Sequence, residues 1–168
     1  MCAAEQTPPP FPADGLSLDT ATGGITGLTF TLREDMAFLR IMPFKGQAGA
    51  TAKALAPWWE GGLPVAGSAT WSGNSGLAWA GANCWLLIRP RGDSADSTEI
   101  TSALDGLAAV SDASDGLFPI DLTGDEIPAL LSKGCSLDLE QFEAGSAAPT
   151  QMAHTRVQLL RLDRSRFR

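Results

Sequence analysis

Residues 110–139 read VSDASDGLFPIDLTGDEIPALLSKGCSLDL, and this stretch decides the class of fold. The apolar runs at 108–111 and 117–122 predict two short strands, separated by a polar turn at 112–116. An amphipathic helix is expected to follow over about residues 125–133. Two strands and a helix in so short a stretch are typical of an α+β domain.

Gly134 directly follows the predicted helix. A glycine just beyond a helix often takes a positive φ angle, which a Cβ atom disfavours. We therefore expect Lys133, Gly134 and Cys135 to form a helix end and a tight reversal, with Gly134 at positive φ, and not an active site.

The same patterns extend outward from this stretch. Cys84–Ile88, the near-continuous apolar run CWLLI, predicts a central strand that is buried on both faces. Further strands are expected at 26–33, 37–42, 68–71, 77–79 and 151–162. Further helices are expected within 47–59, where Pro57 ends the helix, and at 97–107. The sequence thus predicts an α+β fold, with a mostly antiparallel sheet and two or three helices packed on it.

The composition predicts the domain organisation, excludes some classes of partner and indicates a cellular compartment. Residues 1–24 are rich in proline and glycine and predict a flexible arm, and residues 25–168 predict a single domain. A net charge of −7 argues against nucleic-acid and anionic-membrane partners, which recruit lysine and arginine. We see no secretory signal and no apolar run near the ~18 residues of a spanning helix. With three cysteines, an odd number, these features predict a cytoplasmic protein.

Few residues offer nucleophilic chemistry. His154 is the only histidine, so any Ser–His or Cys–His pair must use it. Its place in an alternating segment predicts a solvated strand position instead. Cys84 and Cys135 are expected to be packing thiols, because one lies in an apolar run and the dipole of a preceding helix would raise the thiol pKa of the other.

The acidic residues allow two interpretations. Asp112 and Asp115 flank a predicted turn and could form an acid/base pair, but aspartates in turns more commonly accept backbone N–H groups. Together with Asp121 and Asp125 they lack the spacing of a metal cage. The glycine-rich stretches match no nucleotide-binding motif. The sequence therefore predicts no catalytic, cofactor-binding or metal-binding residue.

Tryptophans suggest a contact surface. Adjacent residues on a helix point about 100° apart, so Trp58 and Trp59 cannot both face inward from a helix. One ring is therefore a candidate partner contact, although both could be covered by this chain's own loops. Phe11, in the proline-rich arm, is a third candidate contact.

From about Arg40 onward the chain resembles the gamma subunit of heterotetrameric sarcosine oxidases. The resemblance is strongest in 110–139, where Lys133-Gly134-Cys135 and the following Leu-Asp-Leu match that family's motif. WAGANCWLLI at 79–88 is similar to a family strand in which Pro-Asp-Glu stands where this chain has Ala82, Asn83 and Cys84. The chain also reaches Arg168 without the aromatic-rich segment usual in the family.

The resemblance implies a fold related to the N-terminal region of the folate-binding domains of the glycine-cleavage T-protein. It also implies an accessory subunit that partners alpha, beta and delta subunits and binds no cofactor itself. FAD, FMN, NAD, zinc and tetrahydrofolate would then belong to those partners. The alternative is a stand-alone tetrahydrofolate-binding or aminomethyltransferase-like protein.

Overall fold

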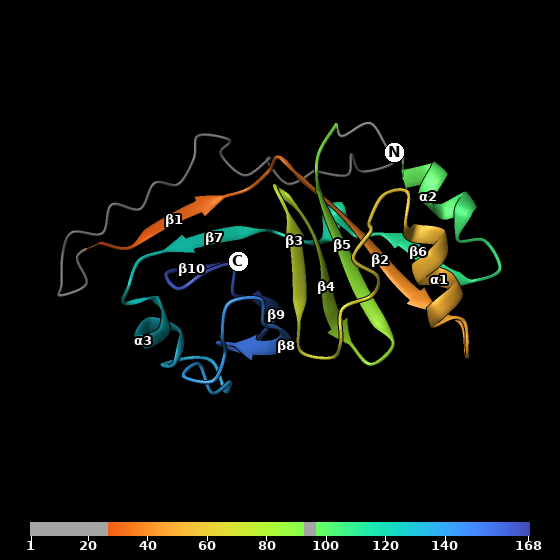
Figure 1. Cartoon of the computed structure of the whole chain (residues 1–168). Helices are drawn as coiled ribbons and strands as arrows, with labels where there is room; N and C mark the ends of the chain where they lie inside the picture. The colour runs from red at the N-terminus through yellow and green to blue at the C-terminus, as the bar shows by residue number, and fades with distance from the viewer. Residues whose placement is uncertain (1–26, 93–96) are drawn as a thin grey trace, which may run out of the picture.

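The computed structural model describes residues 27–92 and 97–168. Within these ranges the chain forms ten strands and three α-helices (Figure 1). The strands are β1 (Thr29–Leu32), β2 (Met36–Pro43), β3 (Ala69–Ser72), β4 (Ser75–Gly81), β5 (Cys84–Pro90), β6 (Ala108–Asp112), β7 (Ile120–Thr123), β8 (Ala147–Met152), β9 (Thr155–Leu160) and β10 (Arg166–Phe167). The helices are α1 (Ala48–Leu55), α2 (Ser97–Ala103) and α3 (Ile127–Leu131), with a 3-10 turn at Ser114–Gly116.

All the strand pairs are antiparallel and form three sheets. The largest has the order β3-β4-β5-β2-β6, the second has the order β1-β7-β10, and β8 and β9 form a hairpin. Helices α1 and α2 lie together at the five-stranded sheet, whereas α3 lies at the other end of the molecule (Figure 1). The predicted α+β class with a mostly antiparallel sheet and two or three helices is therefore confirmed.

Two isolated bridges connect these sheets into one ladder. Ser68, just before β3, pairs with Ser146, just before β8, and Arg161, just after β9, pairs with Phe167 of β10. The strand order therefore continues as β1-β7-β10-β9-β8-β3-β4-β5-β2-β6. Only β1 and β6 remain as outer strands in the described part of the chain.

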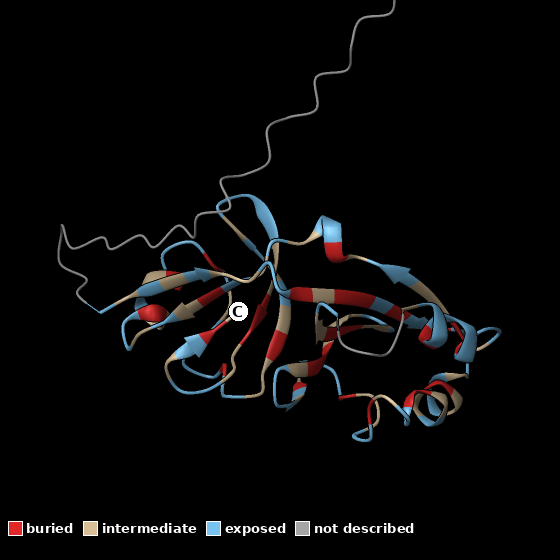
Figure 2. Ribbon diagram, turned by 90° about the horizontal axis from the view of Figure 1, so that it is seen from above, coloured by how far each residue is buried: buried red, intermediate tan, exposed pale blue. Residues whose placement is uncertain are grey.

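The core lies on both faces of the five-stranded sheet. In β5, Leu87 packs with α1 and α2 on one face, whereas Leu86 and Ile88 pack on the other face against the β8–β9 hairpin. Burying each such side chain contributes about 1.5–3 kcal/mol. A third cluster joins α3 to β10, β9 and the Cys135 segment. Figure 2 shows buried residues along the central strands and exposed residues at the margins.

The predicted end of α3 is wrong. Gly134 is not among the residues with positive φ. The last turn instead tightens, because the N–H groups of Lys133 and Gly134 donate to Leu130 and Leu131 in i→i+3 hydrogen bonds. These bonds satisfy the terminal carbonyls without a left-handed residue.

The predicted final strand at 151–162 is a hairpin instead. The alternating pattern did not predict β8 or β10, and it placed His154 in a strand. His154 is exposed and lies with Ala153 in the two-residue turn between β8 and β9, where both have positive φ (45° and 70°). Two positive φ values indicate a type I′ turn, for which neither Ala nor His is a preferred residue.

This turn gives a stability prediction. Replacing Ala153→Asn together with His154→Gly should raise the free energy of unfolding by about 1 kcal/mol, because Asn and Gly tolerate positive φ. Thermal denaturation of the purified chain measures the change. His154→Ala keeps the unfavourable backbone and should give no gain; equal melting temperatures for the double variant and the parent would refute the turn assignment.

Candidate functional site: an arginine–aspartate junction

The described residues with the densest polar contacts lie where two strand pairs pass from one sheet to the other. The short link 33–35 joins β1 to β2, and residues 113–119 join β6 to β7. Strands β1 and β7 pair in the three-stranded sheet, and β2 and β6 pair in the five-stranded sheet. Both connections therefore change sheets at the same place.

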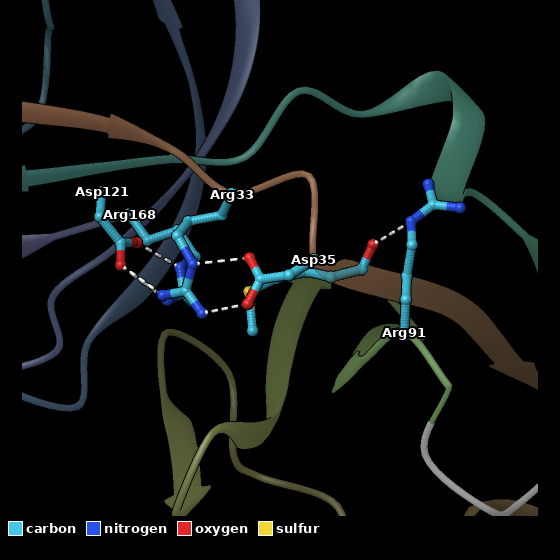
Figure 3. Close-up of polar contacts among 6 residues, drawn as sticks. Arg33, Asp35, Arg91, Asp121 and Arg168 are labelled. Carbon is cyan, nitrogen blue, oxygen red and sulfur yellow. Dashed lines mark hydrogen bonds and ion pairs between the residues drawn. The ribbon is translucent and has the colours of Figure 1, made fainter. Parts of the chain in front are cut away.

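Asp121 of β7 is the centre of this junction (Figure 3). It is only 8% exposed. Its carboxylate accepts a hydrogen bond from Arg33 Nη1 at 2.8 Å and another from Arg168 Nη2 at 3.0 Å, and Arg168 Nε donates to its second oxygen. One carboxylate thus connects β7 to the β1–β2 link and to the residue that follows β10.

Arg33 extends the network toward the surface. Its Nε and Nη2 donate to the two oxygens of Asp35, each at 2.8 Å. This two-pronged geometry is the one that a planar guanidinium and a carboxylate favour. Arg33 therefore lies between two carboxylates, one buried and one exposed (Figure 3).

Arg168 also contacts an aromatic ring of the other sheet. Its guanidinium carbon lies 5.5 Å from the centroid of the Trp71 ring on β3. Trp71 pairs across the ladder with Gly76, and a Cβ at Gly76 would lie 2.4 Å from two ring atoms. The ring can cover the strand only because position 76 has no side chain. The junction thus joins β3 and β4 to β7 and β10.

A second set of polar contacts holds the start of β2 and the turn after β6. The Arg91 amide N–H donates to the Asp35 carbonyl at 2.6 Å. The Arg91 Nε donates to the Met36 carbonyl at 2.9 Å, the one contact of Arg91 that Figure 3 draws. Ser114 Oγ accepts the Phe38 N–H at 2.9 Å, and Asp112 Oδ1 accepts the Ser114 N–H at 2.8 Å. These bonds occupy backbone groups that the ladder leaves unpaired at the crossover.

The charges of the junction are mutually compensated. Burial alone would raise the pKa of Asp121, but the hydrogen bonds and positive charges of Arg168 and Arg33 outweigh burial and hold this pKa below its ordinary value. The hydrogen bond from Arg33 lowers the pKa of Asp35, and the same bond raises the pKa of Arg33. All three groups are therefore charged at neutral pH.

This arrangement is suited to holding strands together and not to chemistry. The buried carboxylate is already occupied by two guanidinium groups and has no titratable proton near neutral pH. Among the described residues, no group of three or more His, Cys, Asp or Glu could hold a metal ion. His154 is exposed in its turn, and burial raises the pKa of the Cys84 thiol, which makes it a poorer nucleophile.

The other residues considered from the sequence are dispersed. Asp112 accepts the Ser114 N–H, as the turn interpretation expected, and Asp115 forms a 3.5 Å ion pair with Arg91 at the surface. Cys135 is buried in the core around α3, as expected of a packing thiol, and its Sγ lies 3.6 Å from Thr150 Oγ1. Cys84 is only half-buried.

The tryptophan pair follows α1 in a hydrogen-bonded turn. Both backbone N–H groups donate to the Leu55 carbonyl. Trp59 is 7% exposed and belongs to the core beneath α1 and α2, so its burial favours a packing role. Trp58 is half-buried against the same core and remains a candidate partner contact. Phe11 and the arm at 1–24 lie outside the described residues.

Asn83 occupies one of the positions where the chain departs from the family pattern. It has a φ of 53° in the turn between β4 and β5, and its Nδ2 donates to the Pro43 carbonyl. Asn tolerates this left-handed conformation better than most residues. In this chain the position therefore has a local structural use.

The junction itself was not predicted from the sequence. Asp121 was considered only as a metal ligand, and Arg33, Trp71 and Arg168 were not singled out. One signal was available, because Asp121 interrupts the otherwise apolar end of the segment LFPIDL, and a charged residue in a buried strand needs a partner. The partners lie 88 and 47 positions away, so spacing could not identify them.

These features define a small α+β chain whose buried charged side chains pair with one another and stabilise its own fold. Residues 45–162 match the sarcosine oxidase, gamma subunit family. The match covers more than half of the chain, and the chain belongs to this family, as its resemblance predicted. No curated protein sequence matches the chain.

The fold is similar to that of a chain in the heterotetrameric sarcosine oxidase from Corynebacterium sp. U-96, solved in complex with pyrrole 2-carboxylate. The TM-score is 0.74 and the identity 24%, and the match covers 86% of this chain and 75% of that chain. In the described part of the chain, no helix is long and apolar enough to cross a membrane.

The junction predicts a stability change that depends on pH. Asp121→Asn should lower the free energy of unfolding by about 3 kcal/mol at pH 7, because it leaves two guanidinium groups without their buried partner. An unfolded aspartate protonates near pH ~3.9, whereas folded Asp121 keeps its charge to lower pH. The stabilisation by Asp121 is therefore present above about pH 4 and is lost as the pH falls further.

Urea denaturation of parent and variant between neutral and acid pH measures this difference. Asp35→Asn is the matched control, since the Asp35 side chain is 59% exposed and the expected loss is below about 1 kcal/mol. Equal losses for Asp121→Asn and Asp35→Asn, or a difference from the parent that does not shrink in acid, would contradict a structural role for the buried carboxylate.

A second prediction concerns the glycine under Trp71. Gly76→Ala should displace the ring and lower the free energy of unfolding by about 2 kcal/mol, because the new methyl group would overlap two ring atoms. Denaturation and near-ultraviolet circular dichroism measure both effects. Gly49→Ala is the control: it lies in α1 with open space around it and should stabilise by about 0.5–1 kcal/mol.

Proposed function

We propose that this chain is an accessory, non-catalytic gamma subunit of a heterotetrameric sarcosine oxidase. Membership of the sarcosine oxidase gamma subunit family carries the proposal. The junction supports it, because its charged groups bind one another and leave no free carboxylate or guanidinium directed at a substrate. The oxidative demethylation of sarcosine or a related N-methyl amine is then catalysed by partner subunits.

The proposed partners are the alpha, beta and delta subunits of such a complex, in the cytoplasm. FAD, FMN, NAD, zinc and tetrahydrofolate are proposed to bind to these partners and not to this chain. Trp58 and Phe11 are candidate contacts with the partners.

Purification with and without partners tests this function. The isolated chain should carry no flavin absorbance and should not oxidise sarcosine, whereas co-expression with the flavoprotein subunits should give a complex that contains this chain in fixed proportion. Titration with tetrahydrofolate tests the alternative of a stand-alone folate-binding protein. Stoichiometric flavin or tight folate binding by the isolated chain would overturn the accessory role.

A cysteine variant distinguishes packing from chemistry within the same complex. Cys135 is buried in the core around α3, so Cys135→Ser should lower the melting temperature by the few degrees expected for about 1 kcal/mol. Turnover of the assembled complex should remain. Complete loss of turnover in a complex that still assembles would assign chemistry to this thiol.

A further inference from the structure

Among the described residues, the five-stranded sheet has one unpaired edge strand, β6, which forms its open margin. The opposite margin, β3, is bridged to the β8–β9 hairpin through Ser68 and Ser146. β6 pairs only with β2 among the described residues. Its sequence, AAVSD, contains no proline and only one charge, at its end. Exposed margins in stable monomers are usually blocked by lysine, proline or a bulge, and β6 has none of these in its interior.

The phase of the ladder shows which backbone groups of β6 face outward. The Phe44 N–H donates to the Leu107 carbonyl and the Ala113 N–H to the Phe38 carbonyl, each at 2.9 Å. Because antiparallel pairs alternate, Ala109 and Ser111 face β2, whereas Val110 and Asp112 direct their backbone groups away from it. Neither the Val110 nor the Asp112 N–H donates to a described residue.

The sheet face beside this margin is also uncovered. The β8–β9 hairpin packs on Met36 and Phe38 at one end of β2, whereas Arg40 and Met42, farther along the same face, are exposed. Met42 is 38% exposed and Phe44, just beyond β2, is 48% exposed. The β6 residues opposite Arg40 and Met42 are the small Ser111 and Ala109, which leave this surface accessible from the margin.

Arg40 gives the surface its charge. Its side chain forms no hydrogen bond or ion pair with any described residue, unlike the side chains of Arg33 and Arg168. In a chain of net charge −7, an arginine side chain without a partner among the described residues, beside the exposed Met42, favours an acidic group on whatever covers it.

A second copy of this chain fits the margin poorly. Two copies would bring together two chains that each carry a charge of −7. A five-residue strand also offers far less area than the roughly 1,200 Å² of a stable interface. Neither the charge repulsion nor the small area argues against an extended segment of a different subunit that also binds this chain elsewhere.

We infer that β6 accepts an extended segment of a partner subunit as an additional antiparallel or parallel strand, an inference that rests on the proposed function. The outward backbone groups of Val110 and Asp112 bind the segment. Its side chains on the open face lie beside Ala109 and Ser111, and one of them is acidic and reaches across β6 to pair with Arg40. The added strand would lie about 10 Å from β2, within reach of paired arginine and glutamate side chains.

Residue-resolved amide exchange tests this arrangement with an internal control. The chain is labelled with 15N, and exchange is compared between the free chain and the complex with its flavoprotein subunits. The Val110 and Asp112 amides should exchange about ten-fold or more slowly in the complex. The Ala109 and Ser111 amides should be protected in both, because they already face β2.

Charge reversal provides a second measurement that does not perturb the ladder. Arg40→Glu should weaken binding to the remaining subunits about ten-fold, with the effect shrinking at high salt. Lys53→Glu makes the same charge change on the exposed side of α1, across the sheet, and should leave the affinity unchanged. Melting curves of both free variants confirm that they are folded.

Each outcome decides between named alternatives. A complex that assembles without protection at Val110 and Asp112 overturns the strand addition and leaves the proposed function standing. Failure of the folded chain to bind any flavoprotein subunit overturns both. A dimer of the isolated chain with a protected Val110 amide assigns the margin to a second copy and overturns the partner assignment.

Discussion

The buried carboxylate of Asp121 is the constraint on which the rest of the architecture depends. Two strand pairs change sheets at one place, and a ladder cannot satisfy all its backbone groups at such a crossing. Side chains hold the crossing instead, because Asp121 binds Arg33 from one connection and Arg168 beyond β10. If the carboxylate were removed, Arg168 would remain buried without a charged partner and Arg33 would keep only Asp35, which costs more than an exposed ion pair contributes.

The junction also connects the three-stranded sheet to the five-stranded sheet. Arg168 stacks on Trp71, and Trp71 lies over the bare backbone of Gly76, so the three-stranded sheet is tied to the β3–β4 hairpin by contact and charge together. Arg161 has a comparable local role, since its guanidinium donates to the carbonyls of Phe142, Asp163 and Arg164 and lies over the Phe167 ring. Both arginines bind other residues of the same chain and stabilise its fold.

In a subunit whose buried charged side chains bind one another, the exposed surface is what remains available for contacts in an assembly. Several of its exposed large apolar side chains lie near the two outer strands: Met42 and Phe44 beside β6, and Ile120 opposite Leu32 of β1. Open margins are hazardous in a free protein because they pair with other chains. In a gamma subunit the same property is useful, and the strongly negative net charge of the chain helps to keep the free form soluble.

The sequence by itself determined the local structure wherever one short segment contained the whole signal. The CWLLI run of β5 predicted a strand buried on both faces, and the 110–139 stretch predicted two strands, a helix and the family. The tertiary structure decided what depends on distant partners. Ala153 and His154 take positive φ because the β8–β9 hairpin requires it, the α3 terminus tightens without a left-handed Gly134, and Trp59 is buried by packing against α1 and α2. Arg33, Asp121 and Arg168 form a site only because the strands that carry them cross, and no spacing in the sequence encodes a contact between residues 88 or 47 positions apart.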